Sequence, residues 1–386
     1  MKRGFYTILS AQFLSALADN ALLFAAIALL QEISAPAWHT PLLQMFFIIA
    51  YIVLAPFVGS FADALPKGRV MFISNSIKLV GCLAMWAGLP PLYAYGIVGI
   101  GAAAYSPAKY GILTEFLPPE LLIKANGWME GTTVAAIILG AIVGGKLASI
   151  SPHVALLAIV GLYLAAAGFN LYIPKLAIDH TVAKRNPLYL IRDFWVSFTI
   201  LWRDEQGQVS LAVTTLFWGA GATMRLVVIA WAAAALNFDL EHATQLTATV
   251  ALGIAFGAVF AARYVKLEES VKVLPAGIAM GVLVMSMVFL HDWRSAALVL
   301  FLVGALSGYF VVPLNALLQH RGHLLIGAGH SIAVQNFNEN IGILLMTALY
   351  TLMVRAELPA IWTVIMFGAF VSLAMTGIYV RYRKLM

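Results

Sequence analysis

Hydrophobic residues make up 62% of the 386 residues, and charged residues only 10%. Since a soluble globular domain is about 25% charged, this composition excludes a soluble protein and predicts an integral membrane protein. The apolar runs are long and unbroken, which predicts spanning helices rather than the short alternating segments of a β-barrel. The net charge of +6 does not point to nucleic acid, because the basic residues lie beside one membrane face. The single cysteine and the lack of a Cys/His cluster predict no disulfide, metal or other cofactor.

The first apolar stretch, residues 11–30, is long enough to cross a bilayer and carries Asp19 and Asn20 in its middle. A carboxylate at that depth costs at least ~2.5–3.5 kcal/mol on insertion scales, so it marks a substrate or ion path. A basic start and the Ala-x-Ala motif at residues 16–18 mimic a cleavable signal peptide. The apolar run continues past that motif, so we expect this helix to be retained.

Twelve apolar segments of about 20 residues each follow one another along the chain. They predict an all-α integral membrane fold with two pseudo-symmetric six-helix bundles, residues 1–174 and 209–386, joined by a linker at 175–208. The predicted spans are 5–32, 41–62, 70–89, 92–114, 122–149, 153–174, 209–236, 243–264, 271–290, 295–318, 329–354 and 358–380.

Most Lys and Arg residues fall on one side of these spans, which the positive-inside rule makes the cytoplasmic side. Only Lys146, Arg294 and Arg355 fall on the other side. Both chain termini are therefore expected in the cytoplasm, as an even number of spans requires.

The linker contains a candidate amphipathic helix. Asn186-Pro187 is a typical helix start, with Asn as the cap and Pro at the first position. Aromatic and aliphatic residues then recur at helical spacing, but Arg192, Asp193 and Arg203 interrupt them, so the segment is too short and too charged to span. We interpret it as a helix on the cytoplasmic face that connects the two halves. A lipid-sensing role is the alternative.

The two halves resemble each other at an offset of roughly 206 residues, which is typical of a duplicated transporter with a central site. Each match is weak alone, but together they place polar residues in equivalent helices. The matched pairs are Asp19 with Arg225, Pro107 with Pro313, Lys109 with Asn315, Asn126 with Gln335, and Glu130 with Glu339.

The loop between the second and third predicted spans, residues 59–69, reads GSFADALPKGR. It resembles the signature loop of the major facilitator superfamily, roughly G-x-x-x-D-R-x-G-R-R, and lies where that superfamily has it. Ala64 replaces the usual Arg and Pro66 the usual Gly, which leaves the detailed hydrogen bonding of the loop open.

This resemblance implies a gating role for Asp63, Lys67 and Arg69. A carboxylate at the end of a span, beside basic residues, can pair with a neighbouring helix end and hold one conformation. From the residues alone, a solvated turn that obeys the positive-inside rule is an equal alternative.

Five segments narrow the resemblance within the superfamily: AQFLSALADNALLF (11–24), GAAAYSPAKYGIL (101–113), LFWGAG (216–221), FVVPLNALLQ (310–319) and AVQNFNEN (333–340). With them, the chain resembles the bacterial lysophospholipid transporter family over essentially its whole length. The resemblance implies movement of lysophosphatidylethanolamine and lysophosphatidylglycerol across the Gram-negative inner membrane, from the outer to the cytoplasmic leaflet. There a partner acyltransferase with acyl-carrier-protein synthetase activity would reacylate them.

In the superfamily fold, the first, fourth, seventh and tenth spans line the cavity, and here they carry Asp19, Lys109, Arg225 and Asn315. The headgroup of lysophosphatidylethanolamine has a phosphate, which Arg225 and Lys109 can bind, and an ammonium, which Asp19 and Asn20 can accept. Alternatively, Asp19 and Arg225 pair with each other across the halves, as a structural bridge or as a gate.

Further polar residues lie in the third, fifth and eleventh spans. Glu130 and Glu339 can bind a substrate amine, carry protons, or neutralise buried Lys109 and Arg225. Gln335 belongs to a polar cluster that is costly toward lipid, so we expect it in the cavity. Lys78 is interpreted as a structural partner or a snorkelling side chain.

Three rival functions remain. A proton-coupled exporter of amphipathic drugs would share the fold, with Glu130 or Glu339 as the proton carrier. A membrane acyltransferase would need an H-x-x-x-x-D or GxSxG pattern, and neither occurs. An ion channel would need a filter-like loop. We therefore expect a monomeric transporter that works by alternating access, with a path that opens sideways toward lipid for the acyl chain.

Overall fold

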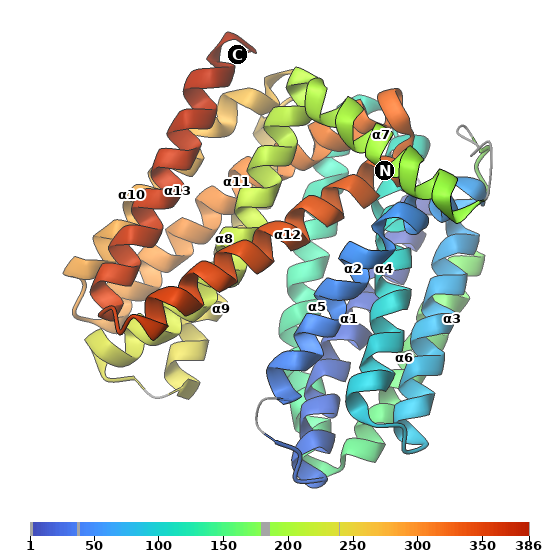
Figure 1. The fold of residues 1–386 in the computed structure, drawn as a ribbon, viewed down its shortest axis with the longest axis horizontal. Helices are drawn as coiled ribbons and strands as arrows, with labels where there is room; N and C mark the ends of the chain where they lie inside the picture. Colours follow the sequence, from blue (N-terminus) through green and yellow to red (C-terminus); the bar gives the residue numbers. More distant parts are fainter. Residues whose placement is uncertain (1–2, 37–38, 179–185, 239, 386) are drawn as a thin grey trace. The chain divides into compact units, whose positions relative to one another are not determined.

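A computed structural model describes residues 3–36, 39–178, 186–238 and 240–385, and within these ranges the chain is almost entirely helical (Figure 1). The helices are α1 (Arg3–Glu32), α2 (His39–Ala64), α3 (Lys67–Trp86), α4 (Pro91–Phe116), η1 (Pro119–Leu121), α5 (Leu122–Ile150), α6 (Pro152–Leu171), α7 (Pro187–Arg203), α8 (Glu205–Leu236), α9 (Leu240–Tyr264), η2 (Leu267–Val273), α10 (Leu274–Ser286), η3 (Met287–Phe289), α11 (Trp293–Ile326), α12 (Ala328–Arg355), α13 (Ala360–Tyr382) and η4 (Arg383–Leu385).

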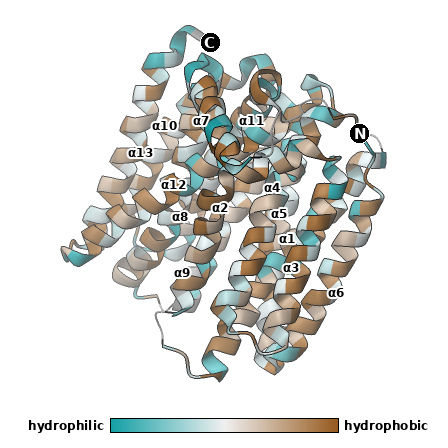
Figure 2. Cartoon of the chain, turned by 45° about the vertical axis from the view of Figure 1, so that its right-hand side comes forward, coloured by the Kyte–Doolittle hydropathy of each residue, from teal (hydrophilic) through white to brown (hydrophobic). Residues whose placement is uncertain are grey.

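Each of the twelve predicted spans falls on a long helical segment, which confirms the all-α membrane fold. By length and composition, eleven of the described helical segments can cross a membrane. The remaining predicted span is α4, a helix of 26 residues that contains Pro107, Lys109 and several tyrosines, which lower its hydropathy. Figure 2 shows the same pattern, with hydrophobic residues along the helices and hydrophilic residues mostly near their ends.

Local sequence signals fix several helix ends. Asn186 accepts a hydrogen bond from the Leu188 N–H at 3.0 Å, which confirms the predicted cap of α7. Asp204 caps α8 in the same way, with the Gly207 N–H at 2.9 Å. Asn237 ends α8 with a φ of 52°, the left-handed conformation that Asn tolerates better than most residues.

Contacts divide the chain into two compact units that exchange segments of the two predicted bundles. Unit 1 comprises Met1–Leu117, Ala135–Leu201 and Gly322–Phe337, and unit 2 comprises Pro118–Val134, Trp202–Arg321 and Asn338–Met386. The start of α5 therefore packs with the second set of spans, and the start of α12 packs with the first set. This reciprocal exchange brings side chains far apart in sequence into contact.

Small residues allow close helix packing within each unit. In unit 1, a Cβ added at Gly144 of α5 would lie 2.6 Å from the Ala21 Cα of α1. In unit 2, α9 and α11 each carry two glycines four residues apart, and a Cβ on any of them would overlap the facing backbone. Such small-residue interfaces are the usual packing device of membrane helices. The four glycines are Gly253, Gly257, Gly304 and Gly308.

Candidate functional site

A buried ion pair lies in the middle of the first span. Lys78 Nζ of α3 lies 2.7 Å from Asp19 Oδ2 of α1, and the Tyr163 hydroxyl of α6 donates to Asp19 Oδ1 at 2.7 Å. The Lys78 side chain is 1% exposed, whereas the Asp19 side chain is 22% exposed. The Asp19 carboxylate is thus partly accessible on one side, whereas the Lys78 ammonium is fully buried between the helices.

Further polar and aromatic groups surround the Lys78 ammonium. It donates to Ser15 Oγ at 3.0 Å, and Ser15 in turn donates to Asn75 Oδ1 at 2.7 Å. The ammonium also lies 4.6 Å from the centroid of the Tyr105 ring, a cation–π distance. We call these residues, Ser15, Asp19, Asn75, Lys78, Tyr105 and Tyr163, the Asp19 cluster.

The Asp19 cluster draws its residues from α1, α3, α4 and α6, all in unit 1. Lys78 is therefore the charge partner of Asp19, which confirms Lys78 as a structural partner. The neighbouring amide of Asn20 donates to the Ala16 carbonyl of its own helix at 2.8 Å.

The other predicted headgroup residues are divided between the two units. Lys109 belongs to unit 1, is half-buried, and its Nζ lies 4.5 Å from the Tyr110 ring centroid. Arg225 on α8 and Asn315 on α11 belong to unit 2. The Arg225 side chain is exposed, and that of Asn315 is buried.

Two amides join the start of α5 to the end of α11 in unit 2. Asn126 donates to Gln319 Oε1 and Gln319 donates to Asn126 Oδ1, both at 2.9 Å. Both side chains are buried. Glu130 lies one turn further along α5 and Asn315 one turn earlier along α11, so each shares a helix face with a member of the amide pair.

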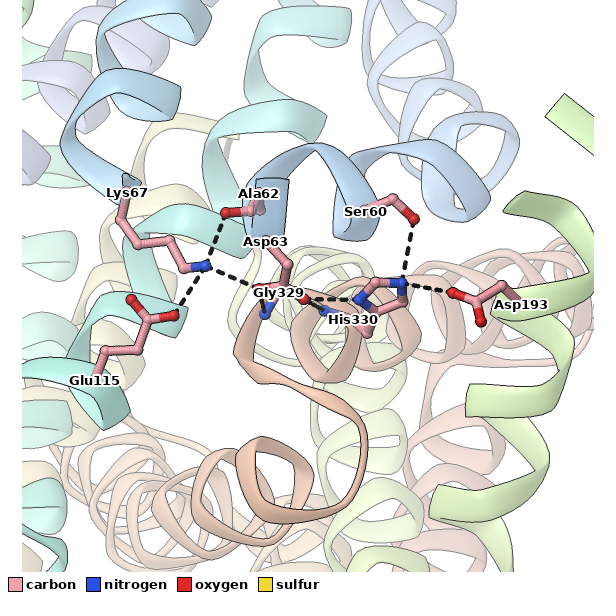
Figure 3. A network of polar contacts seen from close by, with 8 residues as sticks. All are labelled: Ser60, Ala62, Asp63, Lys67, Glu115, Asp193, Gly329 and His330. Carbon is pink, nitrogen blue, oxygen red and sulfur yellow. Dashed lines mark hydrogen bonds and ion pairs between the residues drawn. The ribbon is translucent and has the colours of Figure 1, made fainter. Parts of the chain in front are cut away.

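The carboxylate of Asp63, at the end of α2, caps the start of α12 (Figure 3). The Gly329 N–H donates to Asp63 Oδ1 at 2.8 Å, and the His330 N–H donates to Oδ2 at 3.0 Å. A helix N-terminus has unpaired N–H groups and a positive end of its dipole, so it favours a carboxylate. Gly329 is fitted to this contact, because an added Cβ would lie 2.7 Å from Asp63 Oδ1.

Lys67 connects the same carboxylate to α4. Its Nζ lies 2.8 Å from Asp63 Oδ1 and 3.0 Å from Glu115 Oε1, and it donates to the Ala62 carbonyl at 2.7 Å. The Lys67 side chain is only 4% exposed. One buried ammonium thus faces two carboxylates and a carbonyl, and joins the starts or ends of α2, α3 and α4.

His330 extends the network to the linker helix. Its Nδ1 lies 2.7 Å from Asp63 Oδ2, and its Nε2 lies 3.0 Å from Asp193 Oδ2 of α7 and 3.1 Å from Ser60 Oγ. Since both ring nitrogens face carboxylates, the doubly protonated imidazolium satisfies both contacts by donating from each nitrogen. We call Ser60, Asp63, Lys67, Glu115, Asp193, Gly329 and His330 the Asp63 network (Figure 3).

The third predicted gating residue, Arg69, has an exposed side chain. Sequence reasoning missed Glu115 and His330, and it treated Asp193 only as an interruption of the linker helix. No periodicity or motif marks these three residues, because their contacts join segments far apart in sequence.

The remaining predicted residues lie on α12. Gln335 and Glu339 are buried, Gln335 in unit 1 and Glu339 in unit 2. Between them, the Asn336 amide donates to Ser106 Oγ of α4 at 2.9 Å. The polar character of this helix start thus includes a direct contact with the fourth span.

Comparisons with known proteins place the chain in a family. The Major Facilitator Superfamily model matches residues 8–347. The chain is 48% identical to the lysophospholipid transporter LplT of Yersinia enterocolitica, over 94% of this chain and 90% of that protein. It is 47% identical to the LplT of an Escherichia coli O45:K1 strain, over 99% of this chain and 96% of that protein.

Solved structures agree on the fold. The Escherichia coli fucose:proton symporter FucP matches with a TM-score of 0.78 at 14% identity, over 99% of this chain and 98% of that one. A bacterial homologue of the iron transporter ferroportin, in an outward-facing state, matches with a TM-score of 0.77 at 15% identity, over 99% and 100%. The chain therefore belongs to the major facilitator superfamily and, within it, to the lysophospholipid transporter family.

Proposed function

We propose that this protein moves lysophospholipids from the outer to the cytoplasmic leaflet of the bacterial inner membrane by alternating access. The observation that carries the proposal is the identity of 47% over 99% of the chain to relatives named lysophospholipid transporters. The transported lipids would be lysophosphatidylethanolamine and lysophosphatidylglycerol, with both chain termini in the cytoplasm. A partner acyltransferase with acyl-carrier-protein synthetase activity would then reacylate them, while the transporter itself acts as a monomer.

The headgroup would be recognised by groups of both signs. Lys109 and Arg225 would donate to the phosphate, Arg225 through its planar fork and Lys109 as a point charge, with Asn20 and Asn315 hydrogen-bonding alongside. The open side of Asp19 would accept the ammonium of an ethanolamine headgroup. Because Lys78 already neutralises this carboxylate, an anionic glycerol headgroup would not be strongly repelled.

The Asp63 network would act as the cytoplasmic gate. It holds the end of α2 and the start of α12 together through charge-assisted hydrogen bonds, and Lys67 adds the end of α4. These contacts would have to break for release into the cytoplasmic leaflet. Arg69, exposed beside the network, would contribute through the local positive charge.

The single acyl chain needs apolar surface throughout the cycle, so the path would open sideways toward lipid between the two halves. An environment-sensitive fluorophore attached at that seam would report an apolar surrounding that changes when lysophospholipid is added. A purely aqueous surrounding in every state would contradict the sideways path.

The decisive experiment is uptake of labelled lysophosphatidylethanolamine into spheroplasts, at matched expression. Asp19→Asn and Arg225→Ala should each lower saturable uptake by about tenfold or more, as expected when a charged contact worth ~1.5–3 kcal/mol is lost. Lys272→Gln is the matched control, because that ammonium is exposed and pairs with Glu269 at the surface. Absence of uptake by the unmodified protein would contradict the substrate assignment.

The buried carboxylates Glu130 and Glu339 favour one second candidate, a proton-coupled exporter of amphipathic compounds. Buried carboxylates are the usual proton carriers of membrane transporters. Dye efflux that follows an imposed pH gradient and is lost in Glu130→Gln or Glu339→Gln would support the exporter. Uptake of lysophospholipid that is unaffected by collapse of the gradient would exclude proton coupling.

A further inference from the structure

The linker helix α7 has one face buried against the protein. Phe194, Ser197 and Leu201 are buried there. Phe194, Trp195 and Phe198 lie edge-on to Phe337 of α12, with ring centroids 5.5, 5.7 and 6.2 Å away. Trp195 is also 47% exposed, so it stands at the border of this buried face. This face is therefore already occupied by the start of α12.

The opposite face of α7 exposes large apolar side chains together with two arginines. Leu188 is 77% exposed and Trp195 is 47% exposed, and the guanidinium-bearing side chains of Arg192 and Arg203 are exposed as well. We call this the outer face of α7, and its members are Leu188, Ile191, Arg192, Val196, Ile200 and Arg203, with Trp195 at its border. Aliphatic residues, a Trp and arginines on one side of a helix fit the membrane–water interface and not bulk water.

The charge of the linker fits an anionic surface. Lys175 precedes α7 in the sequence and adds to its two arginines, whereas Lys184 and Arg185 lie outside the described residues. The acidic residues of the linker are Asp179, also outside the described residues, Asp193, Asp204 and Glu205. Asp204 and Glu205 are paired with Arg321 and Lys384. Asp193 is turned away from the outer face, toward His330.

Asp193 is also the point at which α7 contacts the Asp63 network. The Asp193 carboxylate lies 3.0 Å from His330 Nε2, and His330 Nδ1 lies 2.7 Å from Asp63 (Figure 3). A shift of α7 that moves Asp193 would leave His330 with a single carboxylate partner. His330 and Asp193 are thus positioning residues for the Asp63 contact.

We infer that the outer face of α7 docks on anionic phospholipid headgroups of the cytoplasmic leaflet, and that this docking holds Asp193 against His330. Docking on lipid thereby stabilises the hydrogen bonds between the Asp63 carboxylate and the N–H groups at the start of α12. The docking stands without the proposed function, and only the transport readout below rests on it.

Spin labels test the docking on the full chain in proteoliposomes. Cys82 is the single cysteine, so a Cys82→Ala background accepts labels at Ile191→Cys, Val196→Cys or, as the aqueous control, the exposed Glu205→Cys. We expect the first two labels to be accessible to oxygen and shielded from a water-soluble nickel complex. The label at residue 205 should instead be accessible to the nickel complex and less accessible to oxygen. Equal access of nickel to all three labels would overturn the docking.

Lipid charge tests the headgroup class. Adding phosphatidylglycerol to phosphatidylethanolamine vesicles should increase shielding of the label at residue 191, and Arg203→Gln should weaken that response about fivefold, as expected for one basic residue at a charged surface. Lys146→Gln, on the side of the spans predicted to be opposite, is the control. Shielding that is independent of phosphatidylglycerol would show apolar insertion alone and overturn the anionic assignment.

Transport tests the connection to the Asp63 network. We expect lysophosphatidylethanolamine uptake by the unmodified protein to vary with the phosphatidylglycerol content of the membrane. The Asp193→Asn variant should transport without that dependence. The Asp193→Glu variant should regain the dependence. An Asp193→Asn variant that keeps the dependence would overturn the connection. If the unmodified protein transports no lysophospholipid, the proposed function fails, whereas the spin labels still decide the docking.

Discussion

Two buried Asp–Lys pairs in unit 1 have the same chemistry and different surroundings. The pair of Asp19 and Lys78 joins helices of the first six spans only, and its partners are side chains. The pair of Asp63 and Lys67 also binds the backbone N–H groups at the start of α12, which is the eleventh predicted span. The first pair thus joins helices of one predicted bundle, whereas the second joins the ends of α2 and α4 and the start of α3 to the start of α12.

The largest loss of stability is expected when Lys78 is replaced. In Lys78→Met, Asp19 would keep a charge with no ammonium partner, and breaking a buried pair costs about 3–5 kcal/mol. We expect loss of most folded protein, measured by thermal unfolding in detergent. The double variant Lys78→Met with Asp19→Leu should recover stability, because a hydrophobic replacement of the whole pair is often neutral, but it should not recover uptake. A stable single variant would contradict a structural role for Lys78.

The second largest effect is expected when Asp63 is replaced. It should change the conformational equilibrium more than the stability of the fold. Asp63→Asn weakens the hydrogen bonds to Lys67 and to the start of α12, each worth ~1.5–3 kcal/mol when charged. We expect a shift of tenfold or more in the conformational equilibrium, with the fold intact. Labelling of Ser60→Cys in a Cys82→Ala background should become faster in the Asp63→Asn variant. Unchanged labelling would show that the Asp63 network does not gate.

A third, smaller effect is expected at Gly329, which isolates the helix cap from the ion pairs. In Gly329→Ala, the new Cβ would lie 2.7 Å from both Asp63 Oδ1 and the Gly59 carbonyl oxygen, so the start of α12 must move. We expect uptake to fall several-fold with little change in unfolding temperature. Gly145→Ala on α5 is the control, because nothing lies within 4 Å of the added Cβ. Equal uptake by both variants would mean that the cap tolerates displacement.

Much of the fold was predictable from local pattern. Apolar runs marked the spans, and the Asn186-Pro187 step marked the start of α7. Polar residues within spans marked α1, α3 and α4 of the Asp19 cluster, but nothing marked Tyr163 of α6. Lys78 was interpretable as a structural partner because a lone ammonium in an apolar helix needs one.

The Asp63 network was only half predictable. The signature loop pointed to Asp63 and Lys67, but nothing local pointed to His330, which lies 267 residues from Asp63 in sequence. Its partners follow from the exchange of helix starts between the two units, which hydrophobic periodicity does not encode. The amide pair of Asn126 and Gln319 was partly missed for the same reason.

The smallest effect is expected at a third pair, Asp204 with Arg321 in unit 2, which extends the comparison to the protein surface. Burial raises the pKa of Asp204, but hydrogen bonds from Arg321 and from the Gly207 N–H outweigh it and hold the pKa below its usual value. A carboxylate with a lowered pKa stabilises the folded state above its unfolded pKa, and this stabilisation is lost as the pH falls through the folded pKa.

Asp204→Asn should therefore lower the unfolding temperature slightly at neutral pH, by no more than the ~1 kcal/mol typical of partly exposed pairs. The difference from the unmodified protein should shrink on acidification below the ordinary Asp range, and it should also shrink at high salt. Asp292→Asn is the informative control, because Asp292 caps the start of α11 from an exposed loop without a partner helix. If Asp204→Asn destabilised the protein as much as Lys78→Met, burial would not be what separates the three pairs, and the distinction between the Asp19 pair, the Asp63 pair and the surface pair would fail.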